Sequence, residues 1–217
     1  DLVSTLLVLV VSLRHERDYG SNRLGTLRSA PMRRVLLILW SIFAWSIVIS
    51  VSLSIVLVCT ILSPIWPFER IQGSWPGWII GKLPYLTLSR ISVTWDPAVD
   101  PDQTVVFVMN HVSSMDAYVA VHGLPHPFCG LLNASHLKIP GYGGIMRLAN
   151  AIGVPKGKGR FEAVATAALE RKARKISILT FPEAHRTRDG ELRDFRTGAF
   201  FIARDAGMPI VPVSVSG

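Results

Sequence analysis

The segment Val105-Val-Phe-Val-Met-Asn-His-Val-Ser-Ser-Met-Asp116 indicates the fold most directly. Its first five residues form an uninterrupted apolar run, which is typical of a strand buried on both faces of a sheet. Polar residues follow at once, and either Ser113 or Ser114 is suitable as the N-cap of a helix over Ser114–His122. A buried strand that leads through a short polar loop into a helix predicts an α/β domain.

The same pattern recurs further along the chain. Ile176–Phe181 and Ile210–Val215 are apolar runs that we predict to be strands. Helices are predicted over Arg160–Lys175 and Thr197–Ala206, each followed by glycine or by a new strand. This alternation predicts an α/β fold over residues 91–217, with a largely parallel mixed sheet flanked by helices.

A long apolar segment precedes this domain. Residues 35–68 contain no charged side chain, and Val35–Leu62 also lacks Gly and Pro. As a helix these 28 residues would be about 42 Å long, against a hydrocarbon core roughly 30 Å thick. We therefore expect a membrane-anchoring helix over 35–68, followed by an interfacial linker over 69–90. Tryptophans that suit the interfacial belt stand at positions 66, 75 and 78.

Residues 1–34 combine a second apolar run with a basic loop. Leu2–Leu13 is too short to span a membrane, and we expect it to be the remnant of a clipped helix or an interfacial segment. By the positive-inside rule, the loop that follows is cytoplasmic. Its arginines are Arg14, Arg17, Arg23, Arg28, Arg33 and Arg34. Because the chain begins at Asp1 and stops directly after a predicted strand, we expect it to be a piece of a longer protein.

Composition and charge favour a lipid environment. Hydrophobic residues make up 49% of the chain and charged residues 18%, and the formal net charge is +8. A basic surface suits nucleic acid or anionic lipid headgroups, or it has no specific partner. No zinc finger, homeodomain helix or RNP strand is visible, so the apolar content favours lipid. Cys59 and Cys129 lie far apart in apolar stretches and indicate core residues, not a disulfide or a metal site.

The residues after the first predicted strand carry the sharpest chemical pattern. His111 stands at the carboxyl end of a strand, where α/β sheets place their ligands. Asp116 falls in the first turn of the next helix, from which its carboxylate can reach the imidazole and stabilise the imidazolium form. Taken alone, a His with an Asp five residues later is a weak signal. No serine of the nucleophile-elbow kind accompanies it, so a hydrolase triad is not supported.

A second polar segment, Phe181-Pro-Glu-Ala-His-Arg-Thr187, follows another predicted strand. Arg186 and free backbone amides there suit a phosphate, although Arg and Glu are also common in ordinary solvated loops. Lys138 and Lys156 supply further cations near strand ends. The glycines of residues 153–159 do not make a nucleotide loop, because the spacing to the lysine is wrong and neither Ser nor Thr follows it.

Together these segments resemble the glycerolipid acyltransferases of the lysophosphatidate acyltransferase type, from about Ile91 to Gly217. The family's first motif is Asn-His, four residues, then Asp. Its third motif is Phe-Pro-Glu-Gly-Thr-Arg-Ser, followed by Phe-Lys-x-Gly, and its fourth is an apolar strand that holds a proline. The residues that match are Asn110, His111, Asp116, Phe181, Pro182, Glu183, Arg186, Phe195–Gly198 and Pro212.

Four positions depart from the family pattern. Pro155 and Lys156 stand where the second motif usually has Asp and Arg, and Lys binds phosphate as a point charge instead of a fork. In the third motif Ala184 replaces Gly and His185 replaces Thr. A methyl group where the backbone should approach the ligand closely changes the phosphate seat. These departures bear on the acceptor more than on the chemistry.

The resemblance implies transfer of a fatty acyl group from acyl-CoA or acyl carrier protein to the free hydroxyl of a lysophosphatidate-type acceptor, giving phosphatidate. His111 would remove the hydroxyl proton while Asp116 holds it in place, and Glu183 would order its loop or contact the glycerol. The side chains implied to hold the acceptor phosphate are Lys138, Lys156 and Arg186. The partners implied are membrane lipids, the thioester donor and the lyso-lipid, with no nucleic acid. No metal or redox cofactor is implied.

Two alternatives to this function stay open: an acyltransferase for another lysophospholipid or an aminolipid, and a non-catalytic lipid-binding protein on the same fold. Location is open as well. We expect membrane anchoring by residues 35–62 with the domain at the cytoplasmic face, where acyl donors are. A single crossing after a cytoplasmic loop would instead place the domain on the far side. Either the helix does not cross fully, as a re-entrant or interfacial hairpin, or the domain faces the other side.

Overall fold

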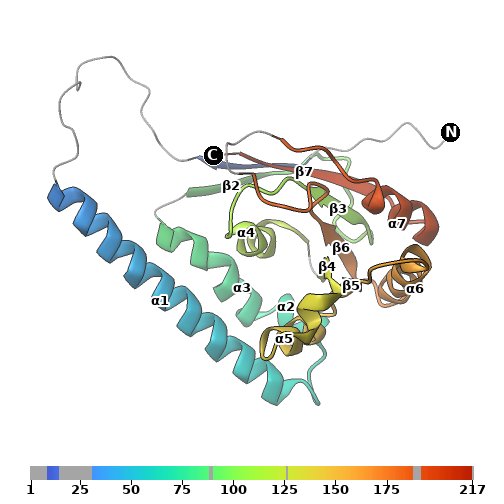
Figure 1. Ribbon diagram of the computed structural model, residues 1–217, viewed down its shortest axis with the longest axis horizontal. Helices are drawn as coiled ribbons and strands as arrows, with labels where there is room; N and C mark the ends of the chain where they lie inside the picture. Colours follow the sequence, from blue (N-terminus) through green and yellow to red (C-terminus); the bar gives the residue numbers. More distant parts are fainter. Residues whose placement is uncertain (1–8, 15–30, 88–89, 126, 188–191, 217) are drawn as a thin grey trace.

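The computed structural model describes residues 9–14, 31–87, 90–125, 127–187 and 192–216. Within them, helices cover both faces of a seven-stranded sheet (Figure 1). The strands are β1 Leu9–Arg14, β2 Arg90–Thr94, β3 Val106–Met109, β4 Phe128–Asn133, β5 Ile152–Val154, β6 Ser177–Thr180 and β7 Ile210–Ser216. The α-helices are α1 Pro31–Leu62, α2 Phe68–Gln72, α3 Trp75–Lys82, α4 Asp116–Gly123, α5 Tyr142–Leu148, α6 Arg160–Ala173 and α7 Gly198–Ala206. The 3₁₀ helices are η1 Leu83–Thr87 and η2 Ala134–Lys138.

The strand order is β2-β1-β7-β3-β6-β4-β5. Neighbouring strands are parallel except β1 and β2, which are antiparallel. The predicted α/β fold with a largely parallel mixed sheet is therefore confirmed. The central strand β3 pairs with β6 and β7, and Val106 is in register with Ile178 on one side and Ile210 on the other.

The alternation of side chains along β3 builds the core on both faces of the sheet. Val106 and Val108 pack on the face covered by α6 and α7, whereas Phe107 and Met109 pack on the face covered by α4. All four are buried, as the apolar run predicts for a strand with helices on both sides. Because β3 is fixed from both sides, the loop that follows it starts from a rigid position.

The three strands predicted from apolar runs are present as β3, β6 and β7, and the three predicted helices as α4, α6 and α7. The structure adds β4 and β5, which extend the sheet beyond β6. Cys129 lies in β4, where burial raises the pKa of its thiol to about 12, so the thiol stays protonated. Cys129 is therefore a core residue, as predicted.

The apolar run at the N-terminus differs from expectation. Leu9–Arg14 forms β1, which pairs with both β2 and β7, so this part is not a helix remnant. A short apolar run suits a strand or a helix equally, and the open edge of β7 provides the partner that the sequence could not reveal. Residues 1–8 and 15–30, which include part of the predicted basic loop, lie outside the described residues.

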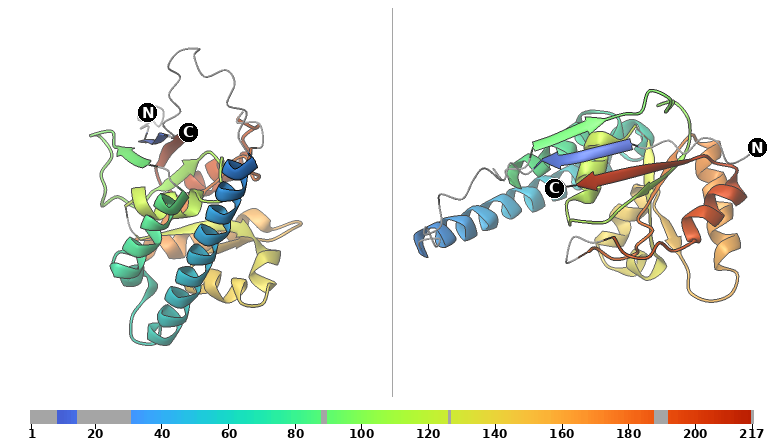
Figure 2. Two further views of the ribbon diagram at one scale, coloured as in Figure 1. Left: turned by 90° about the vertical axis from the view of Figure 1, so that its left-hand side faces the viewer. Right: turned by 90° about the horizontal axis from the view of Figure 1, so that it is seen from above.

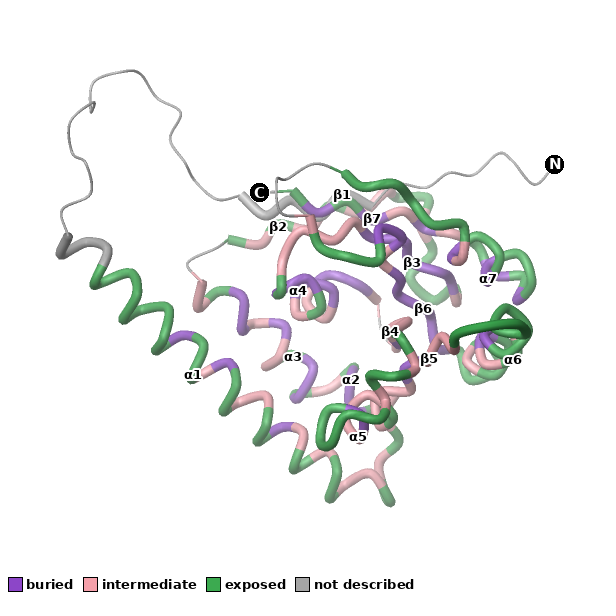
Figure 3. The backbone as a smooth tube through the Cα atoms, in the orientation of Figure 1, coloured by how far each residue is buried: buried purple, intermediate pink, exposed green. Residues whose placement is uncertain are grey.

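The helix α1 stands along one side of the domain, beside α3 (Figure 2). Its portion Val35–Leu62 is long and apolar enough to cross a membrane, by length and composition, which agrees with the predicted membrane-anchoring helix. Most residues of this portion are exposed, as Figure 3 shows, and many of the exposed residues are large and apolar, among them Leu36, Phe43 and Leu57. Such a surface is unfavourable in water and is suited to lipid.

Candidate active site

Two loops meet at the carboxyl edge of the sheet. The histidine loop, residues 110–116, follows β3, and the arginine loop, residues 181–187, follows the neighbouring strand β6. The amide of Thr187 donates a 2.9 Å hydrogen bond to the carbonyl oxygen of His111, which ties the two loops together. The sequence places both segments after strands, and the parallel pairing of β3 with β6 makes those strand ends neighbours.

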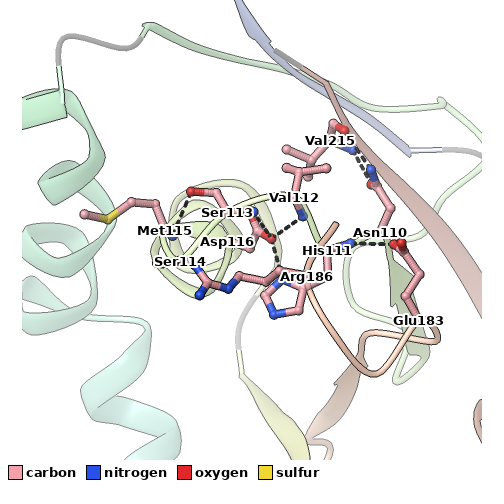
Figure 4. Close-up of polar contacts among 10 residues, drawn as sticks. All are labelled: Asn110, His111, Val112, Ser113, Ser114, Met115, Asp116, Glu183, Arg186 and Val215. Carbon is pink, nitrogen blue, oxygen red and sulfur yellow. Dashed lines mark hydrogen bonds and ion pairs between the residues drawn. The ribbon is translucent and has the colours of Figure 1, made fainter. Parts of the chain in front are cut away.

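His111 and Asp116 form a hydrogen-bonded pair (Figure 4). His111 Nδ1 lies 2.6 Å from Asp116 Oδ2, and the Asp116 side chain is fully buried, at 0% exposure. The same oxygen accepts 2.8 Å hydrogen bonds from the amides of Val112 and Ser113. Because Oδ2 accepts from these donors, it is the acceptor for the imidazole too, so Nδ1 carries a proton and Nε2 is left to accept one.

The imidazole is also held by an aromatic contact. The rings of His111 and Phe181 are stacked, with centroids 4.2 Å apart and planes 24° from parallel. The His111 side chain is 23% exposed, so its ring is reachable from outside while one face is covered. A hydrogen-bonded, partly exposed imidazole at a strand end has the geometry of a general base.

Glu183 joins the two loops from below the surface. Its side chain is buried, and its Oε1 accepts a 2.8 Å hydrogen bond from the amide of His111. Its Oε2 accepts a 3.0 Å hydrogen bond from the amide of Arg193. From the sequence Glu183 was expected to order its loop or to contact the glycerol; the structure places both carboxylate oxygens on backbone amides.

Arg186 lies on the exposed side of the arginine loop. Its guanidinium donates to Ser114 Oγ, in the histidine loop (Figure 4). The structure thus places Arg186 in contact with the histidine loop that carries the His111–Asp116 pair. Ser114, which from the sequence was only a possible N-cap, is the contact that the sequence pattern did not indicate.

Asn110 fixes the start of the histidine loop. Its Nδ2 donates to the carbonyl oxygen of Val215 at 2.8 Å, and its Oδ1 accepts from the Val215 amide at 2.7 Å. The side chain therefore continues the pairing of β3 with β7 by one further step.

Pro212, in the same strand β7, stands in register with Val108. Pro182 is buried and accepts a 2.9 Å hydrogen bond from the amide of Arg196.

Ala184 and His185 occupy the exposed turn of the arginine loop. The amide of Ala184 donates to the carbonyl oxygen of Phe181 at 3.0 Å, which closes the turn. Ala184 has a φ of 61°, in the left-handed region that favours glycine. The departure from Gly at this position therefore carries a conformational cost, because the methyl group must be accommodated at positive φ.

Lys138 and Lys156 stand at the same edge of the sheet but further along it. Lys138 ends η2, which follows β4, and Lys156 follows β5; both side chains are exposed. In the strand order β4 and β5 are the second and third strands from β3. At about 4.8 Å between neighbouring strands, β4 and β5 lie roughly 10 and 14 Å from the axis of β3.

A cavity of about 270 Å³ lies elsewhere, between the end of α1, α2, α5 and the end of α6. None of the side chains predicted for the site lines it. Its cations, Arg147 and Arg174, stand at the carboxyl ends of α5 and α6. Positive charge stabilises these ends of helices, so the two arginines have a structural explanation.

Comparison with known proteins agrees with this geometry. A model of the acyltransferase family matches residues 90–216, more than half of the chain. The chain belongs to the acyltransferase family. The matched segment contains the His111–Asp116 pair and the arginine loop, the two features that define the candidate site of this family member.

Individual relatives support the assignment to this family. The 1-acyl-sn-glycerol-3-phosphate acyltransferase of Limnanthes douglasii is 27% identical over 187 residues, which cover 84% of this chain and 66% of the relative. The enzyme of the same name from Escherichia coli (strain K12) is 30% identical over 143 residues, covering 64% of this chain and 58% of the relative. The chain thus spans only part of the length of both.

A solved acyltransferase shares the fold. The crystal structure of the 1-acyl-sn-glycerophosphate acyltransferase PlsC from Thermotoga maritima superposes with a TM-score of 0.61 at 23% identity. The match covers 83% of this chain and 73% of that chain. It therefore extends beyond the sheet region matched by the family model.

Proposed function

We propose that this protein transfers a fatty acyl group from an acyl thioester, acyl-CoA or acyl carrier protein, to the free hydroxyl of a lysophosphatidate-type acceptor, giving phosphatidate. The observation that carries the proposal is the hydrogen bond between His111 and the buried Asp116. Membership of the acyltransferase family supports acyl transfer, and the names of the relatives support the acceptor.

In the proposed reaction, His111 Nε2 takes the proton of the acceptor hydroxyl as its oxygen attacks the thioester carbonyl carbon. The new carbon–oxygen bond forms, the carbon–sulfur bond breaks, and the imidazolium returns the proton to the leaving thiolate. Asp116 stabilises the imidazolium through Nδ1 and keeps the ring oriented. A general base of this kind typically contributes about 10²–10⁴-fold to the rate.

Acceptor binding would use the cations at the same sheet edge. Arg186 is the nearest candidate for the phosphate, because its contact with Ser114 brings the guanidinium beside the histidine loop. Lys138 and Lys156 would add longer-range attraction from their positions after β4 and β5. Glu183 would support the site by holding the amide of His111.

We further propose that the transfer needs neither a metal ion nor a redox cofactor. The reaction moves one proton and one acyl group with no net change of oxidation state, and an imidazole can serve both proton steps. Activity of the purified protein should therefore persist after extended treatment with a chelator. Loss of activity that a divalent metal restores would contradict this part of the proposal.

A second candidate is the same chemistry on another acceptor, such as a different lysophospholipid or an aminolipid. The observation that favours it is the altered turn of the arginine loop, where Ala184 and His185 are exposed beside Arg186. These side chains stand where the family pattern has Gly and Thr. A headgroup other than a phosphomonoester would contact these exposed side chains.

The deciding experiment is turnover of a labelled acyl thioester by the purified protein with a panel of acceptors. We expect lysophosphatidate to be acylated faster than lysophosphatidylglycerol, lysophosphatidylethanolamine or an aminolipid. If an acceptor without a phosphomonoester reacted faster, lysophosphatidate would not be the preferred acceptor, but the protein would still be an acyltransferase. Absence of transfer to every acceptor, from both acyl-CoA and acyl carrier protein, would support the non-catalytic lipid-binding alternative.

For location, we propose a membrane protein whose domain faces the cytoplasm. The strand β1 precedes α1, and β2 to β7 follow it, yet all belong to one sheet. Both ends of α1 then lie on the same side, which supports an interfacial helix over a single crossing. The six arginines between Arg14 and Arg34 support the cytoplasmic side.

The membrane assignment is tested by extraction. Because α1 binds lipid by the hydrophobic effect, the protein should stay in the membrane fraction through high salt and alkaline washing. Release by salt alone would mean that charge holds the protein at the surface, which would contradict the membrane-anchoring helix.

A further inference from the structure

One stripe along α1 is buried against the domain, although most of the other described residues of Val35–Leu62 are exposed. Ala44, Val48 and Ile55 are buried, whereas Ile49 is 53% exposed. The buried positions are four and seven residues apart, so they lie along one face of the helix. A helix that only anchors a chain in lipid needs no such stripe, and this one indicates a second role for α1.

At the centre of the stripe, Val48 packs with Leu83 of η1 and with Met115. The exposures of these three side chains are 1%, 5% and 7%. We call these residues the seam. It excludes water between the membrane helix and the residue that immediately precedes Asp116.

Polar contacts flank the seam on both sides. Trp40 Nε1 donates a 3.2 Å hydrogen bond to the carbonyl oxygen of Leu86, at η1. Ser52 Oγ lies 3.4 Å from Tyr118 Oη, on the first turn of α4. The register of α1 against η1 and α4 is thus fixed by direction-dependent contacts as well as by packing.

The seam reaches the catalytic pair through one residue. The amide of Met115 donates to Ser113 Oγ at 3.1 Å, and the carbonyl oxygen of Met115 accepts from the amide of Val119 at 2.9 Å, so Met115 is the N-cap residue of α4. Asp116 follows directly and has a short side chain. A shift of Met115 therefore moves the carboxylate relative to His111.

We propose that α1 is a positioning element of the active site: the seam holds the first turn of α4 so that Asp116 stays hydrogen-bonded to His111. The outer face of α1 then meets lipid while its inner face supports the catalytic pair. This inference rests on the proposed acyl transfer. Ordinary core packing would lower stability on loss of the seam, whereas a positioning role lowers the turnover of the folded enzyme.

The test compares seam variants with a matched control on the same helix. Val48→Ala and Met115→Ala should lower kcat about 10- to 100-fold, because a small displacement of a catalytic group has effects of this size. KM for donor and acceptor should stay within about twofold, since the variants touch neither binding group. Ile49→Ala, at the exposed neighbouring position, should keep wild-type turnover.

A conservative change separates positioning from simple loss of fold. Met115→Leu keeps a similar volume and should restore most of the turnover lost in Met115→Ala. All variants are compared at equal folded, membrane-retained protein. A kcat of Val48→Ala equal to that of Ile49→Ala, or a loss confined to KM, would overturn the inference while leaving the proposed function intact.

A second measurement does not depend on turnover. The proton on His111 Nδ1 should give a downfield proton NMR signal, assigned by its absence from His111→Ala. We expect the signal in wild type and Ile49→Ala and its loss or broadening in Val48→Ala. An unchanged signal in Val48→Ala would overturn the inference even if the wild-type protein proved inactive, an outcome that contradicts the proposed function separately.

Discussion

The histidine loop and the arginine loop meet at one edge of the sheet, but their side chains are held very differently. In the histidine loop, Asp116 is fully buried and its Oδ2 accepts three hydrogen bonds from within the loop. In the arginine loop, residues 184–186 are exposed, and Ala184 has a positive φ. The pair proposed for the chemistry is thus fixed by burial, whereas the turn proposed for the acceptor is open to variation.

The largest effect is expected from His111→Ala, which removes the proposed base. Turnover should fall by about 10²–10⁴-fold. The fold should persist, because the loop side chain is not a core element. Initial rates of labelled acyl transfer measure the loss, and circular dichroism checks the fold. His136→Ala, at an exposed histidine of η2, is the control and should keep full activity.

Asp116→Asn changes the same loop and should have a smaller effect on turnover than His111→Ala. The amide can still accept hydrogen bonds, but it is neutral and no longer stabilises the imidazolium. We expect kcat to fall about a hundredfold, consistent with roughly 1.5–3 kcal/mol for a hydrogen bond to a charged group. KM for the lyso-lipid should change little. Wild-type kcat in this variant would show that Asp116 is not the orienting group.

Arg186→Ala tests the arginine loop and should act on binding instead of on turnover. Loss of a charge-assisted contact with the acceptor phosphate should raise KM for lysophosphatidate about ten- to a hundredfold, with KM for the acyl donor little changed. Arg204→Ala, at an exposed arginine of α7, is the matched control. An unchanged dependence on lysophosphatidate would remove Arg186 from the phosphate site.

The smallest effect is expected at Ala184. A residue with a Cβ at positive φ costs about 1–2 kcal/mol, and glycine costs about 0.5–1 kcal/mol in added chain freedom. Ala184→Gly should therefore stabilise the protein by about 0.5–1 kcal/mol, a rise in Tm of about 2–4 °C at most. Ala163→Gly, at an exposed position inside α6, should lower Tm instead. Equal shifts in both variants would contradict the strain at Ala184.

The strands β3, β6 and β7 were predictable because each is a short and mostly apolar run. β3 and β6 are buried along their whole length, whereas β7 is buried at alternate positions, and both kinds of burial leave a clear pattern in the sequence. β4 contains Gly130 and ends at Asn133, and β5 has only three residues, so neither carries a pattern that distinguishes it from a loop. Their place is set by pairing, not by propensity.

In the candidate site, too, contacts between residues close in sequence were predictable, and contacts between distant residues were not. The five-residue spacing of His111 and Asp116 is local, so their approach followed from one loop and one helical turn. The contact of Glu183 with the His111 amide joins residues 72 apart, and that of Asn110 with Val215 joins residues 105 apart. Only the sheet order brings such positions together, and no local pattern states that order. The family motif indicated these residues without their contacts.

The Phe181 ring affects how long the His111 imidazole keeps the orientation in which it is hydrogen-bonded to Asp116. Rotation of the His111 imidazole by half a turn would exchange Nδ1 with a carbon and break the hydrogen bond to Asp116. With Phe181 stacked on one face at 4.2 Å, such a rotation requires the phenyl ring to move first. The ring contact therefore acts on the lifetime of the productive orientation, while the carboxylate acts on its energy. For the proposed acyl transfer, an imidazole that keeps its orientation would be ready each time an acceptor arrives.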